Sequence, residues 1–270
     1  MLPPRALSWL IQTGQEAAGA AHGRIVDGLR ASSNLLFPPC CAFCGESLER
    51  ASLSRPMLCG ACVARLVAPQ RTAACRRCAS PLPQLWGQAD RCPRCLDRRY
   101  FFDRAEALGD YRSHLRQAVL WMKRHPYEPL TRAVGVLLAE LVSNELGQWQ
   151  PDLVIPVPMH WWRRLKRGTN TARVLGGAVA QQLALPISTE LLRCRRKSRK
   201  QGTLRPDERL RNIRGAFCIS SGYDITDKRV LLIDDILTTG ATASEAARML
   251  RQAGAAGVAV AVVARGIGHL

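Results

Sequence analysis

Residues 229–243 read Arg-Val-Leu-Leu-Ile-Asp-Asp-Ile-Leu-Thr-Thr-Gly-Ala-Thr-Ala, and this stretch decides the fold. Its apolar run at 230–233 predicts a central strand that is buried on both faces of a parallel sheet. Asp234 and Asp235 follow at the carboxyl end of that strand, where open α/β sheets bind their ligands. Because the chain then turns into a helix, we expect a ligand site at this point.

The loop after the acidic pair has the composition of an anion-binding site. Thr238, Thr239, Gly240, Ala241 and Thr242 bring backbone N–H groups, threonine hydroxyls and a helix N-terminus to one point. Gly240 has no Cβ, so the backbone can approach a phosphate closely there. Two carboxylates would repel that phosphate, so they are expected to face sugar hydroxyls or a metal ion. A sugar phosphate fits both halves, and the alternative is an Asp-Asp pair that caps an ordinary strand in another doubly wound protein.

The rest of the C-terminal half alternates helices with apolar strands. This order predicts an α/β fold with a doubly wound, mostly parallel sheet that is covered on both faces. We expect strands at 105–111, 153–157, near 187, 229–236 and 258–264, and helices at 113–124, 131–147, 169–183 and 242–253.

Eight of the eleven cysteines form four C-x-x-C pairs, which are Cys41/Cys44, Cys59/Cys62, Cys75/Cys78 and Cys92/Cys95. The pairs are separated by 14, 12 and 13 residues, a spacing that favours metal over disulfides. Four thiolates hold one Zn²⁺, so we predict two structural zinc sites, each made of two consecutive pairs. A cross-braced pairing and redox-active dithiols are the alternatives. Since residues 40–97 contain no long apolar run, metal binding rather than hydrophobic burial is expected to hold them together.

These patterns divide the 270 residues into three parts. Residues 1–36 are a leader that is partly helical or disordered, residues 37–100 a double zinc-ribbon segment, and residues 101–270 the α/β domain. A hydrophobic content of 47% excludes a disordered polymer, and the net charge of +18 indicates a polyanionic partner. We find neither a signal peptide nor a run of about 20 apolar residues, so no transmembrane segment is predicted and the cytoplasm is the expected location.

The run at 229–243 resembles the signature of the type I phosphoribosyltransferases, in which two acidic residues follow an apolar strand and precede a Thr/Ser-Gly-x-Thr loop. The resemblance implies that Asp234 and Asp235 contact the ribose hydroxyls of phosphoribosyl diphosphate and are the candidate catalytic residues. It also implies that residues 238–242 wrap the 5′-phosphate.

Two basic segments could meet the negative charge that grows on the leaving diphosphate, together with Mg²⁺. The first is residues 161–168, where Arg163, Lys166 and Arg167 are expected to face the diphosphate. The second is residues 193–214, with ten Lys/Arg against two acids, which could close as a hood that excludes water. The alternative for each segment is a solvated loop or a surface that holds nucleic acid.

A cysteine-knuckle segment ahead of such a domain resembles the ComF/GntX family, from about residue 36 to the end. The stretches that carry the likeness are residues 36–45, Tyr111 with Met122-Lys123, residues 154–158 with Arg167-Gly168 and Asn170, and Gln201, Leu204, Arg209, Asn212 and Ala216-Phe217. Where the family reads Arg-Gly-aromatic-Asn-Gln, Thr169 and Thr171 flank Asn170 in this chain. These positions are expected near the acceptor side of the site.

The resemblance implies a glycosyltransferase of the phosphoribosyltransferase type, with zinc in its ribbons and Mg²⁺ bound together with phosphoribosyl diphosphate. It further implies a role in natural competence, in the cytoplasm or peripherally at the inner membrane, where the protein would handle imported single-stranded DNA. A helicase-like protein or other DNA-uptake proteins would be its partners. The alternatives are a non-catalytic module that binds single-stranded DNA, or an adaptor of the uptake machinery. The residues do not identify an acceptor.

Overall fold

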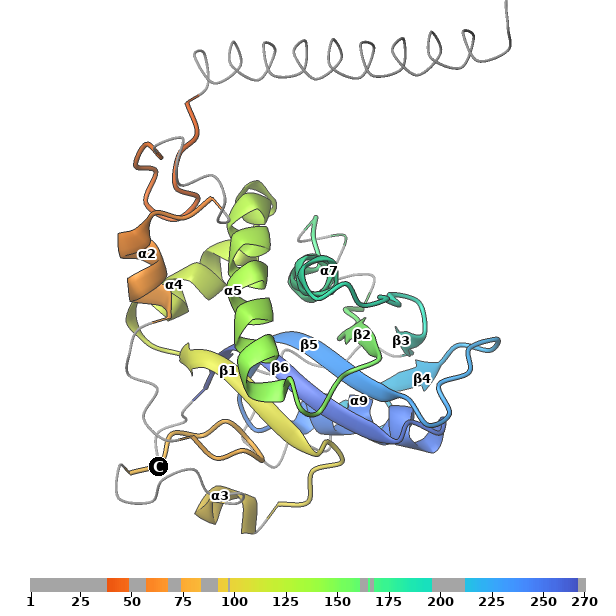
Figure 1. Ribbon diagram of the computed structural model, residues 1–270. Coiled ribbons are helices and arrows are strands. Elements are labelled where there is room, and N and C mark those ends of the chain that lie inside the picture. The colour runs from red at the N-terminus through yellow and green to blue at the C-terminus, as the bar shows by residue number, and fades with distance from the viewer. Residues whose placement is uncertain are drawn as a thin grey trace, which may run out of the picture.

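The computed structural model describes residues 38–48, 57–67, 74–83, 92–96, 98–160, 165, 168–195 and 212–266. Its centre is a four-stranded parallel sheet in the order β1-β6-β5-β2 (Figure 1). The strands are β1 (Arg104–Asp110), β2 (Leu153–Pro156), β5 (Arg229–Leu237) and β6 (Gly257–Arg265). A two-stranded antiparallel sheet pairs β3 (Leu192–Cys194) with β4 (Phe217–Ile219). The predicted α/β class with a mostly parallel sheet is confirmed.

Helices cover both faces of the parallel sheet. They are α4 (Ser113–Met122), the 3₁₀ helix η3 (His125–Tyr127), α5 (Glu128–Leu146), α7 (Thr171–Gln182) and α9 (Ala241–Gln252). Leu231 and Ile233 of β5 pack with α4, α5 and α7, whereas Val230 and Leu232 pack with α9 and the small sheet. Such alternation along one strand is what a central strand of a doubly wound sheet requires. Within the described residues, no helix is both long and apolar enough to span a membrane.

The predicted elements agree with the structure to within a few residues, with one correction, but the short strands β3 and β4 were not predicted. Near Ile187 there is no strand but only an isolated parallel bridge to Val154, because Pro186 precedes this position and the chain turns away after one pairing. Helix α5 begins at Glu128, earlier than predicted, since Pro129 is well suited to a first helical turn.

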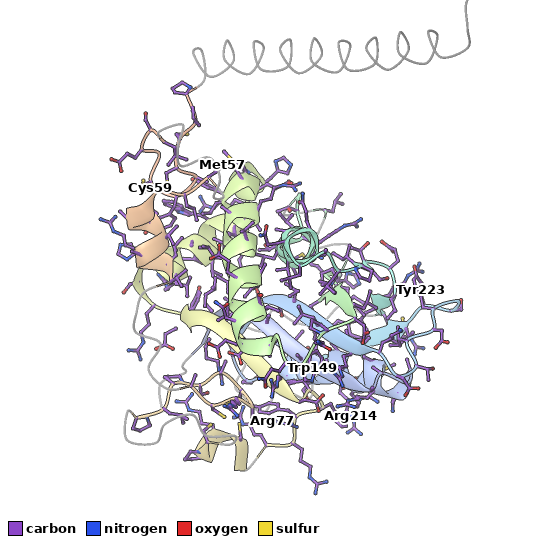
Figure 2. The ribbon with its side chains drawn as sticks, in the orientation of Figure 1. Met57, Cys59, Arg77, Trp149, Arg214 and Tyr223 are labelled. Atoms are coloured by element: carbon purple, nitrogen blue, oxygen red, sulfur yellow. The ribbon has the colours of Figure 1, made fainter. Side chains whose placement is uncertain are left out.

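The two zinc-ribbon halves lie on opposite faces of the sheet. The first, with α2 (Gly60–Leu66), packs beside α4, whereas the second, with α3 (Pro93–Leu96), lies below β1 (Figure 1). Figure 2 shows the same separation between Cys59 and Arg77.

The apolar side chains of the ribbons join the two cores of the α/β domain. The first ribbon adds Phe43, Leu58 and Leu66 to the core under α4 and α5. The second adds Leu82 to the core that contains Tyr100. The prediction that metal alone, and not hydrophobic burial, holds residues 40–97 is therefore wrong in part. The leader at 1–36 lies outside the described residues, and the division at residue 100 stays a prediction.

At β5 the connecting helices pass from one face of the parallel sheet to the other. Helix α7, which packs on β2 and β5, precedes this strand on one face, and α9 follows it on the other. In open parallel sheets a crevice for ligands forms outside the carboxyl ends of the strands where such a change occurs. The carboxyl end of β5 is therefore the position in which the fold favours a ligand.

Candidate functional site

The acidic pair lies at the carboxyl end of β5. Asp234 pairs in register with Val262 of β6, and its Oδ1 accepts the N–H of Asp235 at 2.8 Å. Burial, together with the neighbouring Asp235 carboxylate, raises the pKa of Asp234 well above its usual value. One proton is therefore retained more easily here than on an isolated aspartate, and a ligand that donates hydroxyl hydrogen bonds would favour the ionised form.

A lysine that sequence reasoning assigned no role neutralises the other acid. Lys123 Nζ, at the C-terminal end of α4, lies 3.1 Å from Asp235 Oδ2, and only 21% of the Asp235 side chain is exposed. Lys123 belongs to one of the stretches that resemble the ComF/GntX family, and this was the one signal that could have found it. The Lys123–Asp235 ion pair thus connects the end of α4 to the carboxyl end of β5.

The loop after β5 begins a helix directly, as an anion-binding loop does. Gly240 has a φ of 77°, in the left-handed region, and α9 starts at Ala241, with no acidic residue in its first turn. A Cβ on Gly240 would lie 2.6 Å from Cε1 of Tyr100. The glycine is thus required by the backbone conformation and by the Tyr100 ring, in addition to any close approach of a phosphate.

The basic segments are described only at their edges. Arg163, Lys166 and Arg167 lie outside the described residues, and so does most of the predicted hood, residues 196–211. The returning end of that hood is fixed on α9, because Glu245 Oε1 accepts the N–H of Gly215 at 2.7 Å. Although burial opposes ionisation of Glu245, hydrogen bonds from Arg248 and from Gly215 lower its pKa below the usual value.

Thr171 is a buried residue whose side chain bonds the end of α4, and its expected place near the acceptor side stays a prediction. It begins α7, is 2% exposed, and its Oγ1 donates to the carbonyl oxygen of Met122 at 3.2 Å. Thr171, one of the two residues that depart from the family pattern, therefore supports the end of α4, next to Lys123.

The cysteines form two clusters in the sequential pairing, Cys41/Cys44 with Cys59/Cys62 and Cys75/Cys78 with Cys92/Cys95, and in each the sulfurs lie within 4.8 Å of one another. A tetrahedral Zn²⁺ with Zn–S distances of about 2.3 Å places its sulfurs about 3.8 Å apart. Cys44 and Cys59 are 3.7 Å apart, and Cys78 and Cys92 are 3.6 Å apart. Both clusters therefore fit zinc. All four cysteines of the second cluster are buried, whereas Cys44 of the first is exposed.

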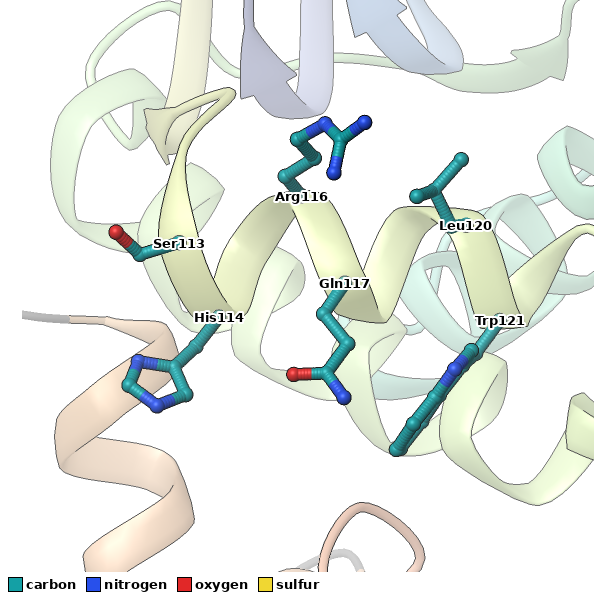
Figure 3. A pocket seen from close by; sticks show the side chains of 6 residues that line it. All are labelled: Ser113, His114, Arg116, Gln117, Leu120 and Trp121. Carbon is teal, nitrogen blue, oxygen red and sulfur yellow. The ribbon is translucent and has the colours of Figure 1, made fainter.

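A further pocket of about 420 Å³ opens on α4, lined by Ser113, His114, Arg116, Gln117, Leu120 and Trp121. Figure 3 shows Arg116 and Leu120 on one side of the helix and His114, Gln117 and Trp121 on the other. The Trp121 ring stacks on Tyr127, with centroids 5.3 Å apart. The sequence from residue 111 to residue 127 contains no acid, and α2, which packs on α4, contains none either. The pocket thus combines one exposed cation, Arg116, with the aromatic ring of Trp121.

Comparison with known families supports this reading of both halves of the chain. Residues 125–268, more than half of the chain, match the family described as phosphoribosyl transferase domain. Residues 32–96 match the family described as double zinc ribbon domain.

Two curated relatives align over most of the chain. Competence protein F of Haemophilus influenzae is 28% identical over 71% of this chain and 84% of its own length. DNA utilization protein YhgH of Salmonella typhimurium is 29% identical over 84% of this chain and 96% of its own length. Among solved structures, a purine phosphoribosyltransferase from Pyrococcus horikoshii superposes with a TM-score of 0.32 at 15% identity, over 48% of this chain and 80% of that protein.

Proposed function

Because the chain belongs to the phosphoribosyl transferase domain family, with a double zinc ribbon ahead of that domain as in its ComF/GntX relatives, we propose that it binds phosphoribosyl diphosphate at the carboxyl end of β5. One observation carries the proposal: the partly buried Asp234/Asp235 pair lies near the carboxyl end of strand β5, two residues before a loop that turns at Gly240 into the N-terminus of α9. Helix N-termini favour phosphate, and carboxylates beside them favour sugar hydroxyls.

Different residues would contact different parts of the ligand. Asp234 and Asp235 would accept hydrogen bonds from the ribose hydroxyls, and Thr238, Thr239, Gly240, Ala241 and Thr242 would hold the 5′-phosphate. The basic residues Arg163, Lys166 and Arg167 belong to the segment assigned to the diphosphate. Mg²⁺, when bound with the ligand, supplies charge that stabilises the leaving diphosphate. Asp235 is already paired with Lys123, so a ribose hydroxyl would have to bind Asp235 beside Lys123 or displace it.

As a phosphoribosyltransferase-type enzyme, the protein would transfer the phosphoribosyl group to an acceptor. The acceptor nucleophile would form a bond to C1 of the ribose while the bond from C1 to the diphosphate oxygen breaks, and the diphosphate would leave with that electron pair. The hood at 193–214, anchored through Gly215 and Glu245, would exclude water from this step. The names of the two relatives support a role of this activity in competence and DNA use.

Titration calorimetry with phosphoribosyl diphosphate and Mg²⁺ tests the binding proposal. We expect saturable binding by the wild-type chain and a loss of at least about a hundredfold in affinity in the Asp234→Asn/Asp235→Asn variant, since each buried charged hydrogen bond contributes roughly 1.5–3 kcal/mol. The variant Asp224→Asn/Asp227→Asn is the matched control, because both of its acids lie exposed on a surface turn. Equal affinity in the two double variants would exclude the acidic pair from the site.

The pocket on α4 favours single-stranded nucleic acid as a second ligand. Trp121, whose ring contacts Phe43 and Tyr127, is partly exposed and could stack on a base. The exposed Arg116 lies on the other side of α4, and Arg112 and Arg124 are exposed just before and just after the helix. Stacking rings combined with a positively charged groove are typical of proteins that bind single strands without sequence preference. A non-catalytic DNA-binding role would use this surface alone.

Fluorescence anisotropy with a labelled single-stranded oligonucleotide at low salt tests this second function. Arg112→Gln/Arg116→Gln is expected to weaken binding several-fold and to reduce its salt dependence, because phosphate contacts release counterions. Arg132→Gln, an exposed arginine of α5 that is paired with Glu128, should leave both unchanged. If the two variants bind equally well, the α4 surface is not the DNA site.

A further inference from the structure

A buried arginine ends strand β6 directly behind the phosphate-binding loop. Arg265 is 3% exposed, and its Nη1 donates to the carbonyl oxygen of Leu237 at 2.6 Å and to that of Thr238. The same nitrogen also donates to the carbonyl oxygen of Gly266 at 2.9 Å. One guanidinium therefore fixes two consecutive carbonyl groups at the start of the loop.

The second zinc ribbon holds this arginine. Arg265 Nε donates to Ser80 Oγ at 3.2 Å, and Ser80 Oγ in turn lies 3.2 Å from Sγ of Cys78, a member of the second cysteine cluster. When Cys78 is a zinc-bound thiolate, its sulfur would accept a hydrogen bond from the Ser80 hydroxyl, and the Ser80 oxygen would accept from Arg265. A Zn²⁺ ion held by the four thiolates of this cluster would have about two negative charges in excess, which would stabilise the buried guanidinium.

Residues 98–101, which follow the second ribbon, bind the next carbonyl group of the loop. Tyr100 Oη and Arg98 Nη1 donate to the carbonyl oxygen of Thr239, at 3.2 and 3.3 Å. The N–H of Phe101 donates to Ser244 Oγ, in the first turns of α9, at 3.1 Å. Arg77, between Cys75 and Cys78, donates to the carbonyl oxygen of Tyr100 at 2.7 Å and so connects the residues after the ribbon to the cluster.

The direction of these three carbonyl groups matters for anion binding. All peptide bonds in the described residues are trans, so the C=O of one residue and the N–H of the next point in opposite directions. Since the carbonyls of residues 237–239 are bonded toward the ribbon and Arg265, the N–H groups of residues 238–240 point away from the ribbon and Arg265. An anion site needs that orientation.

We propose that Arg265, Ser80 and Tyr100 are positioning residues of the phosphate-binding loop, through which the second zinc cluster sets the affinity for the 5′-phosphate. The proposal deepens the proposed function and rests on it. The first cluster packs on the opposite face of the sheet and has no such contact among the described residues.

The test uses the zinc-loaded full chain and two measurements, calorimetric affinity for phosphoribosyl diphosphate and for ribose 5-phosphate, and hydrogen exchange of the amides of residues 238–241. Arg265→Gln is expected to lower both affinities roughly 10- to 100-fold, as loss of an outer-shell partner does at metal sites. Ser80→Ala and Tyr100→Phe each remove one hydroxyl and should lower both affinities by a few-fold. All three should speed exchange in the loop at an unchanged content of two zinc ions per chain.

Matched controls separate positioning from general stability. Arg132→Gln removes an arginine of α5 that bonds Glu128 rather than the loop, and Ser188→Ala removes a hydroxyl that accepts from the N–H of Leu191. Both should leave the exchange of residues 238–241 and the two affinities at wild-type values. Should Arg265→Gln fail to fold, Ser80→Ala and Tyr100→Phe still decide the question.

The outcomes are distinguishable. If the wild-type chain binds neither ligand, the proposed function fails, and the exchange rates alone then decide whether the ribbon braces the loop. Unchanged exchange of residues 238–241 in Ser80→Ala and Tyr100→Phe would overturn the positioning proposal even where phosphoribosyl diphosphate binds. An equal rise in exchange over the whole sheet would overturn it as well, because it would mean a general loss of stability.

Discussion

Removal of both zinc ions is expected to unfold the α/β domain together with the ribbons. Cys41 and Cys62 are buried in the core that contains α4 and α5, and Cys75 and Cys78 in the core that contains Tyr100 and α9. Structural zinc contributes roughly 10–16 kcal/mol per site in zinc-finger peptides, as much as the whole stability of about 5–15 kcal/mol of an ordinary domain. Without zinc, the four cysteines on each face of the sheet would no longer contribute this free energy. The remaining free energy of unfolding would be too small to keep the domain folded.

Thermal unfolding followed by circular dichroism, with zinc content measured at each chelator concentration, checks this expectation. The first zinc should leave from the cluster of Cys41, Cys44, Cys59 and Cys62, because part of it is exposed, and the second only with global unfolding. Cys40→Ser, which alters an exposed cysteine outside both clusters, should keep two zinc ions and the wild-type Tm. A metal-free chain that melts at the wild-type temperature would contradict the account.

Substitution of Gly240 by alanine is expected to have the second largest effect. A residue with a Cβ at a φ of 77° is strained by about 1–2 kcal/mol, and a contact of 2.6 Å with the Tyr100 ring adds overpacking of about 1–3 kcal/mol. The total loss in the free energy of unfolding should be roughly 2–5 kcal/mol. The affinity for phosphoribosyl diphosphate should fall as well, because the loop cannot keep its turn.

Urea unfolding measures the effect, and Gly177→Ala is the matched control. Gly177 lies inside α7, has ordinary helical φ, and a Cβ there would meet nothing within 4 Å. Its replacement should be neutral or stabilise by up to about 1 kcal/mol, since alanine is the better helix former. If both variants lose the same stability, Tyr100 and the left-handed turn do not constrain the loop.

The parts of the fold that depend on local pattern could be predicted from sequence. The apolar run at 230–233 and the acids after it identified β5 and its ligand edge, because a central parallel strand is apolar on both faces. The cysteine spacing identified the two clusters, because a tetrahedral ion fixes how far apart its ligands can lie. These signals are contained within short stretches of chain.

Contacts between distant segments could not be predicted. Lys123 meets Asp235 across 112 positions, and Arg265 meets Ser80 across 185, so no local pattern marks either pair. A lone arginine at the end of a strand is usually a surface residue, and only the fold shows that this one is buried. The burial of Phe43 and Leu58 was not predicted for the same reason, since the core that they join is formed by the distant helices α4 and α5.

The position of phosphoribosyl diphosphate in a crystal structure of the full chain, grown with the ligand and Mg²⁺, tests the central claim most directly. The account predicts the 5′-phosphate within hydrogen-bonding distance of the N–H groups of residues 238–242, and the ribose hydroxyls on Asp234 and Asp235. A ligand bound elsewhere, or a loop that stays empty at saturating ligand, would contradict it.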